Sequence, residues 1–224
     1  MKKLTSILFI LTLILSTVSV NAQKKTKPFT GTISFNIAFE GRELDPNEKA
    51  QMPTEIKTYY GKDNMIRTDQ VSAMGTVSSI SNTKTFETMV LFDMMGQKMA
   101  VKSTKKEYDE SIKDMKYDVT VTDETKTILE YNCKKAIVKN DKGTEMIVYY
   151  TDEINVPNPN ATNPAFKDIK GVALEYTQPT ADEELTLHLT AKEIKKGKVK
   201  KTMFTVPSGY KVITKEEFKS MIGG

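Results

Sequence analysis

Residues 29–39 read FTGTISFNIAF, and this stretch decides the fold class. Its odd positions carry aromatic, aliphatic or glycine residues, and its even positions carry small or polar ones, over eleven residues. Strict period-two alternation is typical of a strand with one face against a core and the other toward water. A helix would instead need apolar residues three and four positions apart. We therefore expect a long, half-buried strand here.

Further strand-like segments follow, each bounded by turn residues. Three pairs flank short turns, namely 88–93 with 98–103, 131–139 with 145–151, and 185–194 with 199–206. Four shorter segments lie at 55–60, 65–69, 77–82 and 171–177. Hairpin spacing requires antiparallel order, because parallel neighbours need long crossover connections. The sequence thus predicts a mainly β fold: a curved antiparallel sheet, or half-barrel, of about ten strands.

Two or three helices are expected to cover this sheet. Residues 104–116 place Tyr108, Ile112 and Met115 on one face among charged neighbours. Residues 214–217 form a capping-box pattern that starts a short terminal helix. Residues 41–53 are polar and could hold one helical turn or none, whereas 155–164, rich in Asn and Pro, are expected to form a loop. If the sheet curls without closing, its concave face is a groove that these helices must fill or cover.

The first 22 residues have the pattern of an export signal. Lys2 and Lys3 precede an apolar run at 7–15, and Val20-Asn21-Ala22 ends the segment with small residues. We predict a signal peptide over 1–22, cleaved after Ala22. The apolar run is too short to span a bilayer, and no cysteine near Ala22 could carry a lipid. A periplasmic or secreted protein without a transmembrane anchor is therefore expected.

The sequence lacks the residue combinations that the common catalytic and metal sites need. Cys133 is the only cysteine and His188 the only histidine, which excludes an intrachain disulfide, a thiolate-rich zinc site and a polyhistidine metal site. A catalytic triad or a His–Cys pair built on His188 is disfavoured too, because this residue alternates outward between leucines. Phosphate loops and nucleophile elbows are missing. We predict no enzyme, no cofactor and no metal, with a carboxylate or tyrosine mechanism as the remaining catalytic alternative.

Two clusters of one residue type have alternative interpretations. Methionines at 89, 94, 95 and 99 crowd one predicted hairpin, where they either fill the core or contact an apolar ligand or membrane. Lysines at 195, 196, 198, 200 and 201 occupy another, where they either protect a sheet edge or attract anionic lipid head groups. The second interpretation predicts peripheral membrane contact. Nucleic acid is not an expected partner, because acidic residues are interspersed through the chain and the formal net charge is only +4.

Several pieces of the chain resemble a family of exported bacterial proteins, the GLPGLI-type family. They are 131–136 (YNCKKA), 149–154 (YYTDEI), 171–176 (GVALEY), 204–210 (FTVPSGY) and, in the first half, 60–67 (YGKDNMIR). IKGV stands at 169–172 in place of the literal GLPGLI string, so the resemblance is to a sister family of unknown function. That group is similar to periplasmic lipoprotein carriers of the LolA kind. The resemblance implies one LolA-like β domain over 23–224, an unclosed half-barrel whose concave face receives acyl chains.

The leading hypothesis is therefore an exported, non-catalytic binding module for an apolar or amphipathic ligand, either a lipid or a lipidated protein. Candidate ligand-binding residues are those that alternation or helical spacing puts on apolar faces: Phe35, Ile37, Met89, Leu91, Met99, Val101, Tyr108 and Ile112. Apolar faces of this kind more often form a plain core. The alternative hypothesis is a structural or protein-interaction component of the cell envelope that has no small-molecule ligand.

Overall fold

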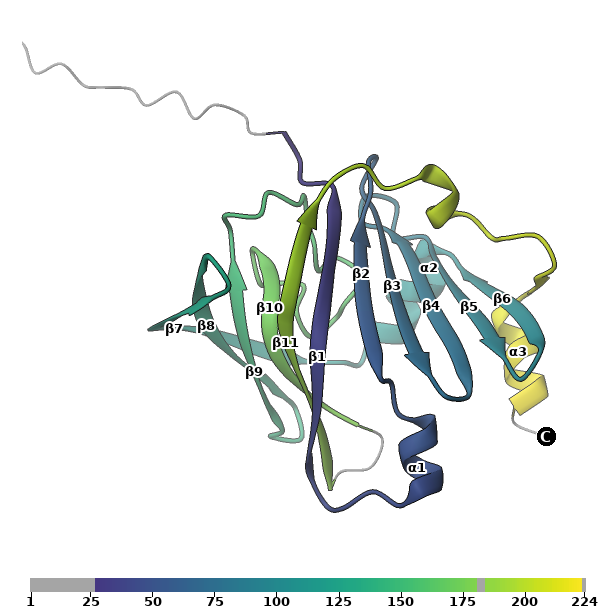
Figure 1. The fold of residues 1–224 in the computed structure, drawn as a ribbon, viewed down its shortest axis with the longest axis horizontal. Helices are drawn as coiled ribbons and strands as arrows, with labels where there is room; N and C mark the ends of the chain where they lie inside the picture. Colours follow the sequence, from purple (N-terminus) through teal and green to yellow (C-terminus); the bar gives the residue numbers. More distant parts are fainter. Residues whose placement is uncertain (1–26, 181–183, 223–224) are drawn as a thin grey trace, which may run out of the picture.

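The computed structural model describes residues 27–180 and 184–222, and these form one twelve-stranded sheet with short helices around it (Figure 1). Its strand order is β12-β6-β5-β4-β3-β2-β1-β11-β10-β9-β8-β7. All neighbours are antiparallel except β12 and β6, which are parallel. The predicted mainly β, antiparallel fold is confirmed. The predicted signal peptide lies outside the described residues.

The elements have the following bounds. The strands are β1 (Gly31–Gly41), β2 (Glu55–Tyr60), β3 (Met65–Ser72), β4 (Gly75–Asn82), β5 (Thr88–Met94), β6 (Gln97–Ser103), β7 (Tyr117–Ile128), β8 (Tyr131–Asn140), β9 (Glu145–Thr151), β10 (Val172–Pro179), β11 (Leu185–Lys196) and β12 (Lys211–Ile213). The helices are α1 (Pro46–Gln51), α2 (Lys105–Ile112), α3 (Lys215–Ile222) and the 3-10 turn η1 (Lys201–Phe204). Among the described residues, no helix is both long and apolar enough to cross a membrane.

Strand β1, which contains residues 31–39 of the alternating segment 29–39, lies in the middle of the sheet. It pairs with β2 on one side and with β11, from the far end of the chain, on the other. The alternation predicted from sequence is visible in part of its burial: Ile33 and Phe35 are 0% and 3% exposed and Asn36 and Ala38 are exposed, but Ser34 on the opposite face is buried as well. Pairing the first strand with β11, from Gly31 with Lys196 to Gly41 with Leu185, closes the largest loop of the fold, which costs entropy that the core must offset.

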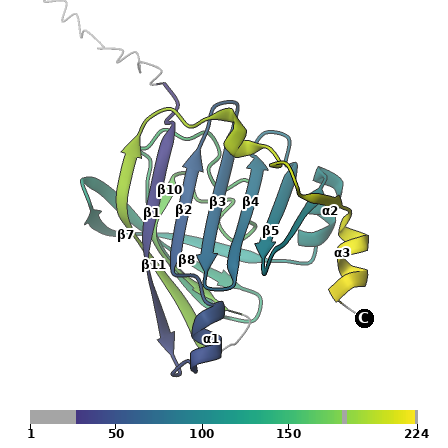
Figure 2. The ribbon, with the colours of Figure 1, turned by 45° about the vertical axis from the view of Figure 1, so that its right-hand side comes forward.

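The face of the sheet that carries Ile33 and Phe35, here called the inner face, is the one toward which the sheet curves (Figure 2). Its core includes residues of the connection between β9 and β10, here called the 152–171 loop. Tyr176 of β10 contacts both Phe35 and Phe166 edge-to-face, with ring centroids 6.0 Å and 5.5 Å apart. Ala165, Phe166 and Ile169 of the loop are all buried there. Part of the predicted groove is thus filled by a loop.

The opposite, outer face has its own small core. Ile80, Leu91 and Ala100 are buried, and Phe204, Val206 and Tyr210 of the C-terminal segment pack against them. Figure 2 shows this yellow-green segment crossing in front of β3 and β4, while α2 lies behind the sheet. The predicted strand 199–206 is therefore wrong. Its apolar residues cover the outer face as η1 and extended chain, because β1 already occupies the edge of β11 where a hairpin partner would pair.

The two helices predicted at 104–116 and after 214 are present, but the first is shorter than predicted. The predicted helix 104–116 is α2, which ends at Ile112, and the predicted capping box at Thr214 is confirmed by reciprocal hydrogen bonds with Glu217. Helix α3 lies on the inner face of β5, where Phe218 stacks on Phe92 with centroids 5.0 Å apart. Strand β7 was missed in the sequence because its outward positions and many of its inward ones are charged or polar.

Candidate functional site

The six strand residues proposed from sequence as groove residues do not share one face. Directly paired residues of a sheet point to the same side, so the ladder from β1 through β6 can be followed rung by rung. That ladder places Phe35 and Ile37 on the inner face together with Met99 and Val101. The remaining two candidates, both from β5, pair with outer-face residues of β4. The expectation of a single groove lined by all six is therefore wrong.

Met89 and Leu91 belong to the outer-face core. Leu91 is 1% exposed, and Met89 packs beside it. Every residue of β5 from 89 to 92 is apolar, so alternation in this strand could not decide which set points inward. On the inner face, Phe35 and Val101 are buried, whereas Ile37 and Met99 are half-buried. Phe35 and Leu91 are thus core residues, one on each face of the sheet.

The last two candidates, Tyr108 and Ile112, lie together in the wall of one cavity. It encloses about 730 Å³ between α2 and the 152–171 loop. Phe86, from the connection between β4 and β5, completes the wall. Cavities of roughly 300–1,000 Å³ are typical of small-molecule sites. The site therefore lies at one end of the sheet and not along the groove itself.

Helix α2 is well formed but loosely attached. Thr104 and Glu107 cap it reciprocally, which satisfies backbone N–H groups that a helix start leaves without partners. Tyr108 Oη donates to the carbonyl oxygen of Ala161 at 3.1 Å, and its ring lies 5.8 Å from that of Phe86. None of the helix residues is buried. Partial burial raises the pKa of Tyr108, so its hydroxyl stays a hydrogen-bond donor at neutral pH.

The 152–171 loop forms a firmly held second wall. Asn160 Nδ2 donates to the carbonyl oxygens of Ile169 and Gly171, both at 2.9 Å, and so ties the middle of the loop to its C-terminal end. Gly171 is required by close approach, because a Cβ there would lie 2.6 Å from the carbonyl oxygen of Thr151. Phe166 anchors the loop in the inner-face core. The sequence predicted a loop here but carried no signal for its place in the core.

The cavity combines an apolar surface with charged groups. Its apolar lining residues are Phe86, Tyr108, Ile112, Ile154, Val156 and Ile169. Its charged ones are Lys105, Asp109, Asp152, Lys167, Asp168 and Lys170. Lys105 pairs with Asp109 at 2.5 Å, and Asp152 pairs with Lys134 at 2.9 Å, whereas Lys167 and Lys170 are exposed and form no ion pair with any described residue. Such a lining suits a molecule with an apolar body and a polar head.

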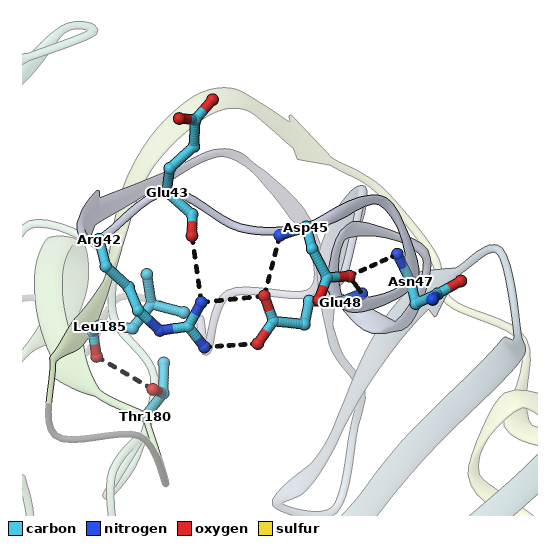
Figure 3. Close-up of polar contacts among 7 residues, drawn as sticks. All are labelled: Arg42, Glu43, Asp45, Asn47, Glu48, Thr180 and Leu185. Atoms are coloured by element: carbon cyan, nitrogen blue, oxygen red, sulfur yellow. Dashed lines mark hydrogen bonds and ion pairs between the residues drawn. The ribbon is translucent and has the colours of Figure 1, made fainter.

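A smaller cavity of about 380 Å³ lies beside α1, at the opposite end of β1. Figure 3 shows the contacts that hold this corner: Arg42 Nη1 and Nη2 donate to the two carboxylate oxygens of Glu48 at 2.9 and 2.5 Å. The backbone N–H of Asp45 also donates to Glu48. Hydrogen bonds from Arg42 and Asp45 lower the pKa of Glu48 to about 2. These contacts cap the helix, which accounts for them structurally.

His188, the only histidine, lies on the outer face in a network of charged groups. Its Nδ1 is 3.2 Å from Glu40 Oε1 and its Nε2 is 3.6 Å from Glu175 Oε1. Lys126 Nζ contacts both oxygens of the buried Glu175, at 2.8 and 2.7 Å. This arrangement links β1, β7, β10 and β11 and leaves Glu175 fully paired. A structural role explains it, since a buried carboxylate needs partners.

Reactive groups elsewhere are sparse. Cys133 is buried, and desolvation raises the pKa of its thiol to about 11, which keeps the sulfur protonated at neutral pH. Within residues 27–180 and 184–222, no three His, Cys, Asp or Glu side chains gather closely enough to hold a metal ion.

Comparisons with known proteins give a fold and no family. No protein-family model matches the chain, and no curated protein does. The structure of PNGF-II is similar with a TM-score of 0.54 and 18% identity, over 87% of this chain and 33% of that one. This chain thus spans about a third of the length of PNGF-II, with which it shares a fold. The resemblance to GLPGLI-type proteins stays a prediction.

Two more distant structures cover most of both chains. One is an uncharacterised conserved protein from Thermus thermophilus, with a TM-score of 0.47 and 10% identity over 84% of this chain and 90% of that one. The other is a domain named for outer membrane lipoprotein sorting, from Vibrio parahaemolyticus, with a TM-score of 0.18 and 9% identity over 79% and 88%.

Proposed function

We propose that this protein is an exported, non-catalytic binding module that holds a lipid-like amphipathic molecule between α2 and the 152–171 loop. The observation that carries the proposal is the cavity of about 730 Å³, whose wall is partly apolar and partly charged. An apolar wall favours an acyl chain, and charged groups beside it favour a polar head group. The predicted export signal supports an envelope ligand.

Burial of an acyl chain supplies enough free energy for such binding. Each methylene removed from water contributes about 0.8 kcal/mol, so about ten methylenes against Ile112, Ile154 and Ile169 contribute roughly 8 kcal/mol before the costs of association. The hydrogen-bonding head group then needs a charged partner that is not already neutralised. Lys167 and Lys170 meet this requirement on the loop side.

The loose attachment of α2 supports entry from that side. The Tyr108 hydroxyl links the helix to Ala161 of the loop, and the Tyr108 ring links it to Phe86 of the β4–β5 connection. A helix with no buried residue can move away at low cost, since few apolar contacts are lost. The loop wall, in contrast, cannot move without pulling Phe166 out of the core.

Native mass spectrometry of protein purified gently from its own cell envelope tests the proposal. We expect a co-purifying lipid or acyl adduct, lost from the Ile112→Glu variant because a carboxylate would face the apolar wall. Met115→Glu is the matched control, since Met115 lies three residues further along, is 49% exposed and does not line the cavity. Two outcomes would contradict the proposal: no adduct on the parent protein, or an equal loss of adduct from both variants.

A second candidate function is an envelope interaction protein without a ligand. The observation that favours it is the filled inner face over β8–β10, where Ala165, Phe166 and Ile169 occupy the space that a half-barrel carrier would leave open. Pull-down from crosslinked cells separates the two functions. A stoichiometric protein partner together with lipid-free protein would favour this second candidate.

A further inference from the structure

We infer that one end of the sheet is a docking surface for an anionic phospholipid membrane, positioned so that the cavity lies beside the bilayer. Its central part is the segment 195–201, which carries lysines at 195, 196, 198, 200 and 201, all exposed. In the described part of the chain, only Lys195 has a carboxylate within ion-pair distance, Glu193 at 2.9 Å. The other four lysines are therefore not neutralised by the protein.

The fold adds lysines from two other segments to this end. Gly31 of β1 pairs with Lys196 on one side and with Tyr60 on the other, so the start of β1, the end of β11 and the β2–β3 turn lie together (Figure 1). The backbone N–H of Gly197 donates to the carbonyl oxygen of Thr30 at 3.0 Å. The segments 27–31, 61–64 and 193–201 together contain seven lysines and two carboxylates. We call this group of three segments the basic end.

The other end of β1 is mainly acidic. It carries Glu40, Glu43, Asp45, Glu48 and Glu184, with Arg42 and Lys49 among them. Eleven extended residues separate the two ends by roughly 35 Å. A negative surface attracts the basic end and repels the acidic end, and both forces turn the molecule in the same direction. The protein therefore approaches such a surface with its basic end first. The asymmetry thus sets the orientation of docking as well as its affinity.

The cavity lies at the basic end. The backbone N–H of Phe29 donates at 2.7 Å to the carbonyl oxygen of Asn155, a residue of the cavity wall. Thr83 joins the β2–β3 turn to the same loop: its N–H donates to the carbonyl oxygen of Asn64 at 2.9 Å, and its hydroxyl to that of Pro157 at 3.3 Å. The basic end and the 152–171 loop are therefore held together by one direct hydrogen bond and by this one bridging residue.

The residue types favour lipid over nucleic acid. All seven basic residues of the basic end are lysines, whose aliphatic stems can lie along an interface while the ammonium groups meet phosphates. Nucleic-acid grooves combine arginine and exposed aromatic side chains. The segment 195–201 contains neither. Membrane docking deepens the proposed function, because it places that cavity where a lipid is exchanged; only the identity of the cargo rests on that proposal.

Co-sedimentation with phospholipid vesicles tests the docking surface. The purified protein is mixed with phosphatidylcholine vesicles, either pure or containing about 30% phosphatidylglycerol. We expect binding only to the anionic vesicles, and weaker binding at about 300 mM salt than at about 50 mM. Each lysine near a charged surface contributes about fivefold in affinity, so Lys198→Gln, Lys200→Gln and Lys201→Gln combined should weaken binding on the order of a hundredfold.

The matched control changes three exposed lysines away from the basic end, Lys49, Lys142 and Lys219, to Gln. Both triple variants keep the same net charge as one another, so only position differs. Equal binding to neutral vesicles, equal losses from both triple variants, or no binding by the parent protein would overturn the inference. Tighter binding to duplex DNA than to anionic vesicles at equal phosphate concentration would overturn it too.

The same assay keeps docking and cargo binding distinguishable. The Ile112→Glu variant should sediment with anionic vesicles as the parent protein does, since its change lies in the cavity wall. The Lys198, Lys200 and Lys201 variant should retain its co-purified lipid in native mass spectrometry. A parent protein that binds anionic vesicles but carries no co-purified lipid would leave the docking surface standing and remove only the cavity proposal.

Discussion

The two walls of the cavity differ in a way that reverses the usual expectation about helices and loops. Helix α2 is regular and capped at its start, yet none of its residues is buried. The 152–171 loop contains no helix or strand, yet Phe166 and Ile169 are buried and Asn160 ties its middle to its C-terminal end. Local hydrogen bonding determines the shape of a segment, whereas burial determines how hard it is to move. We therefore expect the loop to be the rigid wall and the helix the movable one.

The largest loss of stability should come from truncating Phe166, the side chain that holds the loop in the core. Phe166→Ala removes a buried ring that contacts Tyr176, and we expect a loss of about 3–5 kcal/mol in the free energy of unfolding. Urea denaturation followed by far-UV circular dichroism measures it. Ile112→Ala in the opposite wall, as the control, should cost under about 1 kcal/mol. Similar losses from both changes would refute the contrast between the walls.

Removing the polar tie of the loop should have an intermediate effect. Asn160→Leu leaves the carbonyl oxygens of Ile169 and Gly171 without their donor, and we expect a cost of about 1–3 kcal/mol. Hydrogen exchange of the amides in 160–171 should accelerate along with it. An unchanged exchange rate in that segment would show that the apolar anchor alone holds the loop.

Loosening the helix should change its local motion more than the global stability. Tyr108→Phe removes the hydrogen bond to the Ala161 carbonyl and keeps the ring against Phe86. We expect faster hydrogen exchange in α2 and a loss of about 0.5–1.5 kcal/mol at most. Exchange in the loop should stay as in the parent protein. Equally accelerated exchange in both walls would mean that they move as one unit.

Acid should loosen the helix by a smaller amount. Hydrogen bonds from Thr104 lower the pKa of Glu107 below its ordinary value of 4.5. A carboxyl with a lowered pKa in the folded state stabilises above its unfolded pKa, and this contribution is lost as the pH falls through the folded pKa. Amide exchange in α2, corrected for its intrinsic pH dependence, should therefore rise below about pH 4. Glu107→Gln should abolish this rise.

How much of the site could be predicted from the sequence depended on the kind of element. In α2, helical spacing grouped Tyr108 with Ile112, and the structure places both in the cavity wall. In β5, all residues from 89 to 92 are apolar, so the sequence left the orientation of Met89 and Leu91 open. The loop residues Ile154, Val156 and Ile169 were missed because no periodic pattern marks an irregular segment that packs into a core.

Local patterns alone determined that this chain forms a broad antiparallel sheet, since side-chain alternation and turn residues act over a few neighbouring positions. They also determined where α2 and α3 begin. Only the tertiary structure decided that β1 pairs with β11, that the segment 199–206 covers the outer face, and that a loop fills part of the inner face. These choices depend on which apolar surfaces remain exposed once the strands have paired. Distant segments compete to cover those surfaces, and a local stretch of sequence cannot show which segment does so.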